Sequence, residues 1–102
     1  MAASGKRIGK KEKNDTFYKA ILLLRNEEEC YNFFRDVCTV TELRSIEQRF
    51  EVARLLNEGM VYNEILERTG ASSATISRVA RSINDSTGGY DSVFARLKDE
   101  KL

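Results

Sequence analysis

A glycine separates two short runs of helically spaced apolar residues, and this pattern strongly restricts how the chain can fold. Met60 to Asn84 reads MVYNEILERTGASSATISRVARSIN. The spacing predicts a first helix over about residues 62–68, with Ile65 as its inward residue. Gly70 then supplies a position that adopts positive φ at low cost, as a sharp turn between two helices often requires. Leu66 stands where most such motifs have a small residue between the helices, which predicts a wider or differently angled crossing.

A second helix is predicted to follow this turn. Ser72 or Ser73 offers a side-chain oxygen that can cap its first turn. Its inward face carries Ile76, Val79 and Ile83, which are three and four residues apart, so one apolar stripe faces the first helix. The whole stretch therefore predicts a helix-turn-helix.

The outward face of the second helix has the chemistry of a DNA-reading surface. It is small and hydroxyl-bearing at its start and basic further on, and it consists of Ser73, Ala74, Ser77, Arg78 and Arg81. Short side chains let a helix approach base edges in the major groove, while arginines contact phosphates. The alternative is a helical hairpin that touches no nucleic acid, because hairpins with a glycine in the turn are common in all-α proteins.

Composition predicts a soluble, all-α protein. A chain of 102 residues supports one modest core, which oligomerisation often extends. The apolar fraction of 41% and the charged fraction of 32% argue against disorder. Pro is absent and β-branched residues do not alternate over any sustained run, so helices are expected throughout.

Charge is unevenly distributed along the chain, although the formal net charge is only +1. Residues 27–51 carry seven acids and three bases, whereas the only charges within 69–84 are Arg78 and Arg81. Residues 1–13 carry five bases and one acid and lack periodicity. They predict a flexible basic arm that either contacts phosphates or acts as a solubilising tail. Residues 14–102 form the predicted folded domain.

Several classes of protein are disfavoured by what the sequence lacks. No apolar run is long enough to span a membrane, and no signal-peptide pattern follows the basic start. The chain has no His and only Cys30 and Cys38 as cysteines, so neither a metal site nor a cofactor is expected. Without a paired nucleophile and base, an enzyme is not expected. The cysteines indicate reduced, semi-buried thiols in a cytoplasmic protein, with a thiol switch as the alternative.

Two helices are predicted before residue 39. Asn14 or Asp15 caps the first, which is expected to continue to Arg25 with an apolar surface too broad for a single neighbour. Asn26 and the acids at 27–29 open the second, because negative charge complements the N-terminal dipole of a helix. Its predicted buried face consists of Cys30, Phe33, Phe34 and Val37.

A long helix is predicted from the capping-box pair Thr39 and Glu42 to about Asn57. Its apolar stripe comprises Leu43, Ile46, Phe50 and Ala53, widened by Val52, Leu55 and Leu56. A last short helix is expected to begin at Tyr90 or Asp91 and to dock through Val93, Phe94 and Leu97. These helices offer more apolar surface than thin partners within one chain can bury. We therefore expect a homodimer in which the first three helices interlock with those of a second copy.

The run from Cys38 to Tyr90 resembles the Trp repressor superfamily, and within it the YerC/YecD group of small bacterial proteins. The matching positions are Thr39, Gln48-Arg49, Leu55-Leu56, Glu58-Gly59, Glu64-Ile65, Gly70-Ala71, Ala74-Thr75-Ile76-Ser77-Arg78 and Thr87-Gly88-Gly89-Tyr90. The resemblance implies six helices, an intertwined homodimer and a pair of helix-turn-helix units that meet two half-sites on double-stranded DNA.

For DNA, the resemblance implies a sequence-specific transcription regulator. The repressor's reading positions fall on Ser73, Ala74, Thr75 and Ser77. Side chains this short reach base edges poorly, so water bridges and DNA shape are expected to contribute to readout. The full set of candidate DNA-binding residues is Ser72, Ser73, Ala74, Thr75, Ser77, Arg78 and Arg81. The alternative function is a structural or protein-interaction dimer whose helix-turn-helix does not read DNA specifically.

The resemblance also implies a possible effector site. The repressor's two indole-flanking arginines, amine-contacting serine and pocket threonine match, in that order, Arg49, Arg78, Ser82 and Thr39. Two departures weigh against tryptophan: Val79 replaces a glycine beside the bound indole, and Asp36 replaces an apolar residue. An amino-acid-like effector, a different small ligand and the absence of any effector remain the alternatives.

Overall fold

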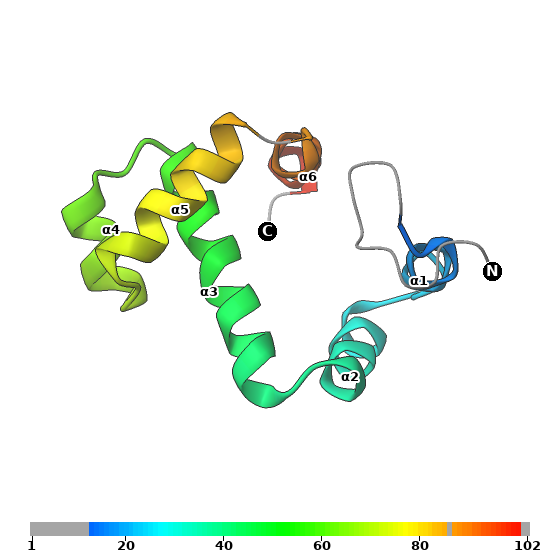
Figure 1. Ribbon diagram of the computed structural model, residues 1–102. Helices are drawn as coiled ribbons and strands as arrows, with labels where there is room; N and C mark the ends of the chain where they lie inside the picture. Colours follow the sequence, from blue (N-terminus) through cyan, green and yellow to red (C-terminus); the bar gives the residue numbers. More distant parts are fainter. Residues whose placement is uncertain (1–12, 86, 101–102) are drawn as a thin grey trace. The chain divides into compact units, whose positions relative to one another are not determined.

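The described residues of the computed structural model, 13–85 and 87–100, form six α-helices and no strand (Figure 1). The helices are α1 (Asp15–Ile21), α2 (Glu27–Val37), α3 (Val40–Asn57), α4 (Tyr62–Thr69), α5 (Ser73–Asn84) and α6 (Gly89–Glu100). The predicted all-α class is therefore confirmed. The chain divides between Cys38 and Thr39 into two compact units. Apart from Lys13, the predicted basic arm lies outside the described residues.

The first unit contains α1 and α2, and the side chain of an asparagine caps each helix. Asn14 accepts a hydrogen bond from the backbone N–H of Phe17 at 3.0 Å. Asn26 accepts one from the N–H of Glu29 at 2.8 Å, so α2 begins at its acidic triplet as predicted. The predicted end of the first helix at Arg25 is wrong. The N–H groups of Leu23 and Leu24 donate to carbonyls only three residues back, and this tighter winding ends α1 at Ile21.

The predicted buried face of α2 is only partly formed within the chain. Phe33 stacks on Phe17, with ring centroids 6.1 Å apart, and Phe33 and Phe34 are half-buried. Cys30 and Val37 are exposed, so their predicted burial is wrong for the single chain. Cys38 is half-buried. Two short helices cannot surround each other's apolar side chains, and no residue of α1 or α2 is buried.

The long helix α3 begins and ends where the sequence predicts. Thr39 accepts a hydrogen bond from the backbone N–H of Glu42 at 3.0 Å. The Glu42 carboxylate accepts one in return from the Thr39 N–H at 2.8 Å. This reciprocal pair is the predicted capping box.

We expect Thr39→Ala to lower the free energy of unfolding by about 1 kcal/mol, because the alanine side chain cannot accept the Glu42 N–H. Thr39→Ser is the matched control, since it keeps the hydroxyl and should lose much less. Urea denaturation of the three proteins measures the difference. Equal losses in both variants would mean that the capping hydroxyl contributes little.

The core lies in the second unit, where α4 and α5 pack against α3 (Figure 1). Its buried members are Val52, Ala53, Leu55, Ile65, Ala71, Ile76, Val79 and Phe94. Phe94 brings α6 onto this core, and Phe50, Ile83 and Leu97 pack partly buried around it. The predicted stripe of α3 is wrong at Ile46, which is 42% exposed, because the buried face centres on the second half of the helix. Val93, predicted to dock, is also exposed.

No helix among the described residues is long and apolar enough to cross a membrane.

Candidate nucleic-acid interface

The turn between α4 and α5 has the predicted geometry. Gly70 ends α4 with φ of 72°, and its N–H donates to the Leu66 carbonyl at 3.0 Å. The Thr69 hydroxyl donates to the Ile65 carbonyl at 2.7 Å and accepts the N–H of Ala71 at 3.1 Å. A backbone with positive φ followed by a buried alanine lets the chain reverse over only three residues, 70–72, before α5 begins.

One side chain of α3 reaches this turn. The Gln48 Nε2 donates a hydrogen bond to the Thr69 carbonyl at 3.2 Å, in a partly buried position. The predicted position of Leu66 between the two helices is wrong, because Leu66 lies at the surface of α4 with 38% of its area exposed. The two helices therefore meet through Ile65 and Ile76, both fully buried.

Ser72, rather than Ser73, caps α5. Its hydroxyl oxygen accepts the N–H of Thr75 at 3.1 Å, and it also lies 3.1 Å from the Thr75 hydroxyl, to which it donates. The hydroxyl groups of Ser72 and Thr75 therefore both take part in hydrogen bonds within the first turn of α5. Ser73 and Ala74 are exposed beside them.

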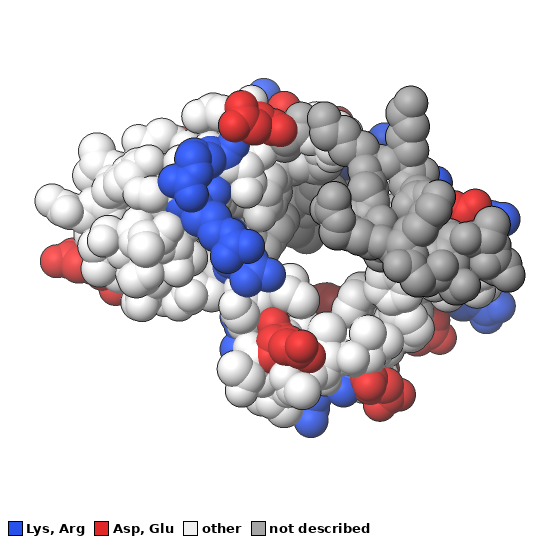
Figure 2. Space-filling view, viewed as in Figure 1, with Lys and Arg blue, Asp and Glu red and all other residues white. Residues whose placement is uncertain are grey.

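The outward face of α5 carries two arginines that extend from a helix whose opposite face is buried. Ile76 and Val79 face the core, while Arg78 and Arg81 are exposed. Figure 2 shows a strip of basic side chains over α5, with uncharged surface along its sides and an acidic side chain at its upper end. Neither arginine side chain forms an ion pair or hydrogen bond with another residue in 13–85 or 87–100. Both guanidinium groups therefore remain available to an anionic partner.

Arg54 on α3 contrasts with these two arginines. It donates to Glu51 at 2.6 Å and to Glu58 at 2.7 Å, so its charge is neutralised along its own helix. The hydrogen bond from Arg54 lowers the pKa of Glu51, which keeps that carboxylate ionised. This network joins three charged side chains along the surface of α3, whereas Arg78 and Arg81 have no such partners among the described residues.

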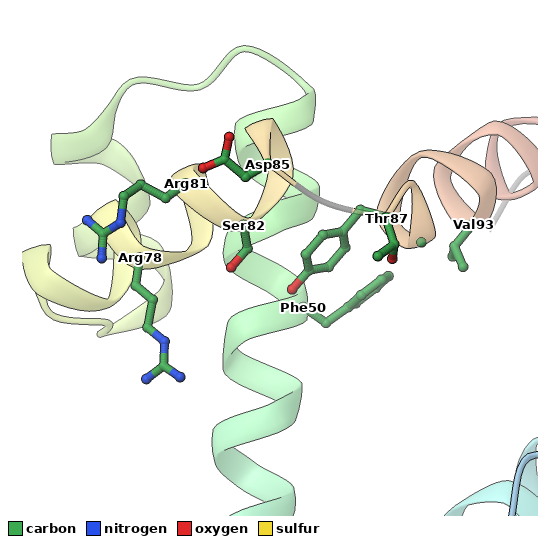
Figure 3. A pocket seen from close by; sticks show the side chains of 9 residues that line it. Phe50, Arg78, Arg81, Ser82, Asp85, Thr87 and Val93 are labelled. Carbon is green, nitrogen blue, oxygen red and sulfur yellow. The ribbon is translucent and has the colours of Figure 1, made fainter. Parts of the chain in front are cut away.

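A groove runs beside α5 and is shared with α3 and α6 (Figure 3). It has a volume of about 750 Å³. It is lined by aromatic, hydroxyl-bearing and charged residues, namely Phe50, Arg78, Arg81, Ser82, Asp85, Thr87, Gly89, Tyr90 and Val93. The side chains of Arg78 and Arg81 extend from its edge and away from Phe50 (Figure 3). The ring centroid of Phe94 lies 5.6 Å from that of Phe50 and 5.7 Å from that of Tyr90, which makes this wall a packed aromatic cluster. An apolar body with a negatively charged group has the matching chemistry.

The structure brings together only half of the predicted effector residues within one chain. Arg78 and Ser82 line the groove. Thr39 uses its hydroxyl to cap α3, and the Arg49 Nη1 donates to the Ser45 hydroxyl at 3.0 Å. Val79 is 2% exposed, belongs to the core and does not line the groove.

The aromatic wall of the groove was missed by sequence reasoning. Phe50 was assigned to the general core stripe, and Tyr90 only to the start of a helix. The available signal is the position of Tyr90 directly after a Gly-Gly pair, where the chain turns between α5 and α6. For metals the described residues offer no group of three ligating side chains.

The chain is similar to known proteins along most of its length. Residues 12–98 match the model of the Trp repressor protein family. The uncharacterized protein YerC of Bacillus subtilis (strain 168) is 48% identical over 85 residues, which cover 83% of this chain and 82% of YerC.

Two solved structures share both sequence and fold with the chain. A TrpR-like protein from Eubacterium eligens ATCC 27750 is 54% identical, with a TM-score of 0.79 and coverage of 82% of this chain and 87% of that one. A protein proposed to be a Trp repressor from Staphylococcus aureus is 45% identical, with a TM-score of 0.79 and coverage of 82% and 84%. The family and the fold inferred from the residues are therefore confirmed.

Proposed function

Because the chain belongs to the Trp repressor family, we propose that it is a sequence-specific DNA-binding transcription regulator that acts as a homodimer. The observation that carries this proposal is the outward face of α5. It presents small and hydroxyl-bearing side chains followed by two arginines whose side chains have no partner within residues 13–85 and 87–100, on a helix whose other face is buried in the core. A regulator of this kind needs no catalytic group.

The length of this face fits the major groove. Ser73 and Arg81 are eight residues apart, which is about 12 Å along a helix and close to the width of the groove. Ser73, Ala74 and Ser77 can then approach base edges while Arg78 and Arg81 contact phosphates. Thr75 and Ser72 contribute mainly through the cap that orients the first turn.

The exposed apolar side chains support a dimer. Isolated exposed apolar residues are ordinary in a monomer, but α2, α3 and the turn that follows α1 expose many of them, including Leu22, Leu23, Val37, Val40 and Ile46. A second copy that interlocks these helices would bury them and would pair two copies of α5. Sedimentation equilibrium should give twice the mass of the chain. A monomer at micromolar concentration would contradict this part of the proposal.

Selection of duplexes from a random library by the purified protein tests sequence-specific binding. We expect an enriched site composed of two inverted half-sites, because a two-fold dimer presents two equivalent reading helices. The enriched duplex should bind at least tenfold more tightly than a scrambled duplex at moderate salt. Equal binding of both would favour the alternative, a protein-interaction dimer that does not read DNA.

The groove beside α5 favours a second element of the proposal, a small effector. L-tryptophan and indole-3-acetate are suitable probes, because each has an aromatic body and a carboxylate. We expect a bound probe to raise the melting temperature of the wild type. Arg78→Gln should abolish this rise, whereas Arg49→Gln should preserve it, since Arg78 lines the groove and Arg49 bonds within α3.

The two variants also separate two arrangements of the effector site. A rise abolished by both substitutions would place the ligand between arginines brought together by the dimer, as in the repressor. No rise in the wild type with either probe would argue against an aromatic acid as effector.

A further inference from the structure

We infer that Gln48 is a positioning residue for DNA recognition, which fixes the turn of the helix-turn-helix against α3. This inference rests on the proposed DNA binding. Gln48 lies on the long helix, and its Nε2 donates to the Thr69 carbonyl at 3.2 Å. The two residues are 21 positions apart, so the bond joins elements that the backbone alone does not hold together.

The acceptor of this bond, the Thr69 carbonyl, lies at the end of α4, directly before the turn of the helix-turn-helix. Thr69 is the last residue of α4, and only Gly70, Ala71 and Ser72 separate it from α5. The last carbonyls of a helix have no partner within the helix, so they require one from outside. Gln48 supplies that partner directly before the chain reverses.

The neighbouring polar contacts cannot perform this task. The Thr69 hydroxyl bonds to Ile65 within α4, and the Ser72 hydroxyl bonds to Thr75 within α5. These bonds hold each helix end in shape. They do not fix the direction of either helix relative to α3, because the donor and the acceptor of each bond belong to the same helix end and move together.

Apolar packing leaves that direction incompletely fixed. Contacts among Ile65, Ile76 and Val79 are non-directional, so they stabilise the pair of helices but restrain its rotation weakly. A hydrogen bond depends on angle as well as on distance. For a 12-residue helix about 18 Å long, a rotation of about 10° at the turn moves the far end by about 3 Å. Such a rotation would misalign Ser73, Ala74 and Ser77 with the base edges, whereas the long, flexible arginine side chains can still follow their phosphates.

The test uses Gln48→Met, which keeps the length of the side chain and removes its N–H donor. We expect the affinity for the selected duplex to fall about tenfold, with less than a twofold change for a scrambled duplex, because one lost hydrogen bond per protomer misorients base reading. Thr41→Ala is the control, since Thr41 is an exposed residue of the same helix. Its two affinities should match those of the wild type.

All affinities are measured well below the melting temperature, so that each protein is fully folded. If Gln48 only stabilises the fold, Gln48→Met would lower the melting temperature and leave the ratio of specific to non-specific affinity unchanged. That result would overturn the inference.

Hydrogen exchange gives a readout that does not depend on DNA. In Gln48→Met the amides of Gly70 and Ala71 should exchange at least threefold faster than in the wild type, relative to that of Leu55 in the core. Unchanged exchange at the turn would also overturn the inference. If the wild type itself fails to discriminate between duplexes, the proposed function fails, and the exchange rates alone decide whether Gln48 fixes the turn.

Discussion

Arg78→Ala is expected to weaken duplex binding about tenfold or more near 0.1 M salt and to flatten its salt dependence. The guanidinium of Arg78 is exposed on the outward face of α5 and has no anionic partner among the described residues. In the proposed dimer each substitution removes two phosphate contacts. Because each contact contributes about −0.9 to the slope of log K against log salt, the slope should become less negative by about 2.

Arg81→Ala should change the slope by a similar amount, and in the double variant the slope should become less negative by about 4. Arg96→Ala is the matched control, because it removes the same charge from an exposed position on α6 that does not line the groove. Fluorescence anisotropy with the selected duplex between 50 and 200 mM salt, as a rough working range, measures the wild type and the four variants. Slopes unchanged in both arginine variants would mean that α5 does not face the phosphates.

The second large effect concerns stability rather than binding. Ile65→Ala should lower the free energy of unfolding by about 3 kcal/mol, because Ile65 is fully buried and its loss leaves a cavity between α3, α4 and α5. Ile65 is the buried residue through which α4 holds to the core. Its substitution should therefore also weaken the packing of α5 against the core.

Leu66→Ala provides the comparison, since Leu66 is the next residue, has a side chain of the same size and lies at the surface. Its cost should be about 1 kcal/mol or less. Urea denaturation at equal protein concentrations measures both variants, because the stability of the proposed dimer depends on concentration. Similar losses in the two variants would contradict the observed orientation of α4.

The features that sequence predicted well are those set by neighbouring residues. The helix-turn-helix follows from Gly70 and from the spacing of Ile65, Ile76 and Val79, all of which act within one or two turns of helix. The capping box of α3 and the start of α2 are equally local. Their chemistry requires no knowledge of what packs against them.

The features that sequence missed depend on distant neighbours. Ile46 matches the period of a buried stripe, yet the described part of the chain leaves it exposed. The aromatic wall of the groove joins Phe50 to Tyr90 across 40 positions, a distance at which periodicity carries no information. The resemblance assigned Thr39 and Arg49 to the effector site, but helix capping and a bond within α3 occupy these side chains here.

Arg78 and Arg81 line the groove and also face outward from the reading helix. A ligand that draws these guanidinium groups into the groove and a phosphate backbone that draws them outward would compete for the same charges. Thermodynamic reciprocity then fixes the size of the effect in both directions. The factor by which the ligand weakens DNA binding equals the factor by which DNA weakens ligand binding, so a single measured ratio predicts the other.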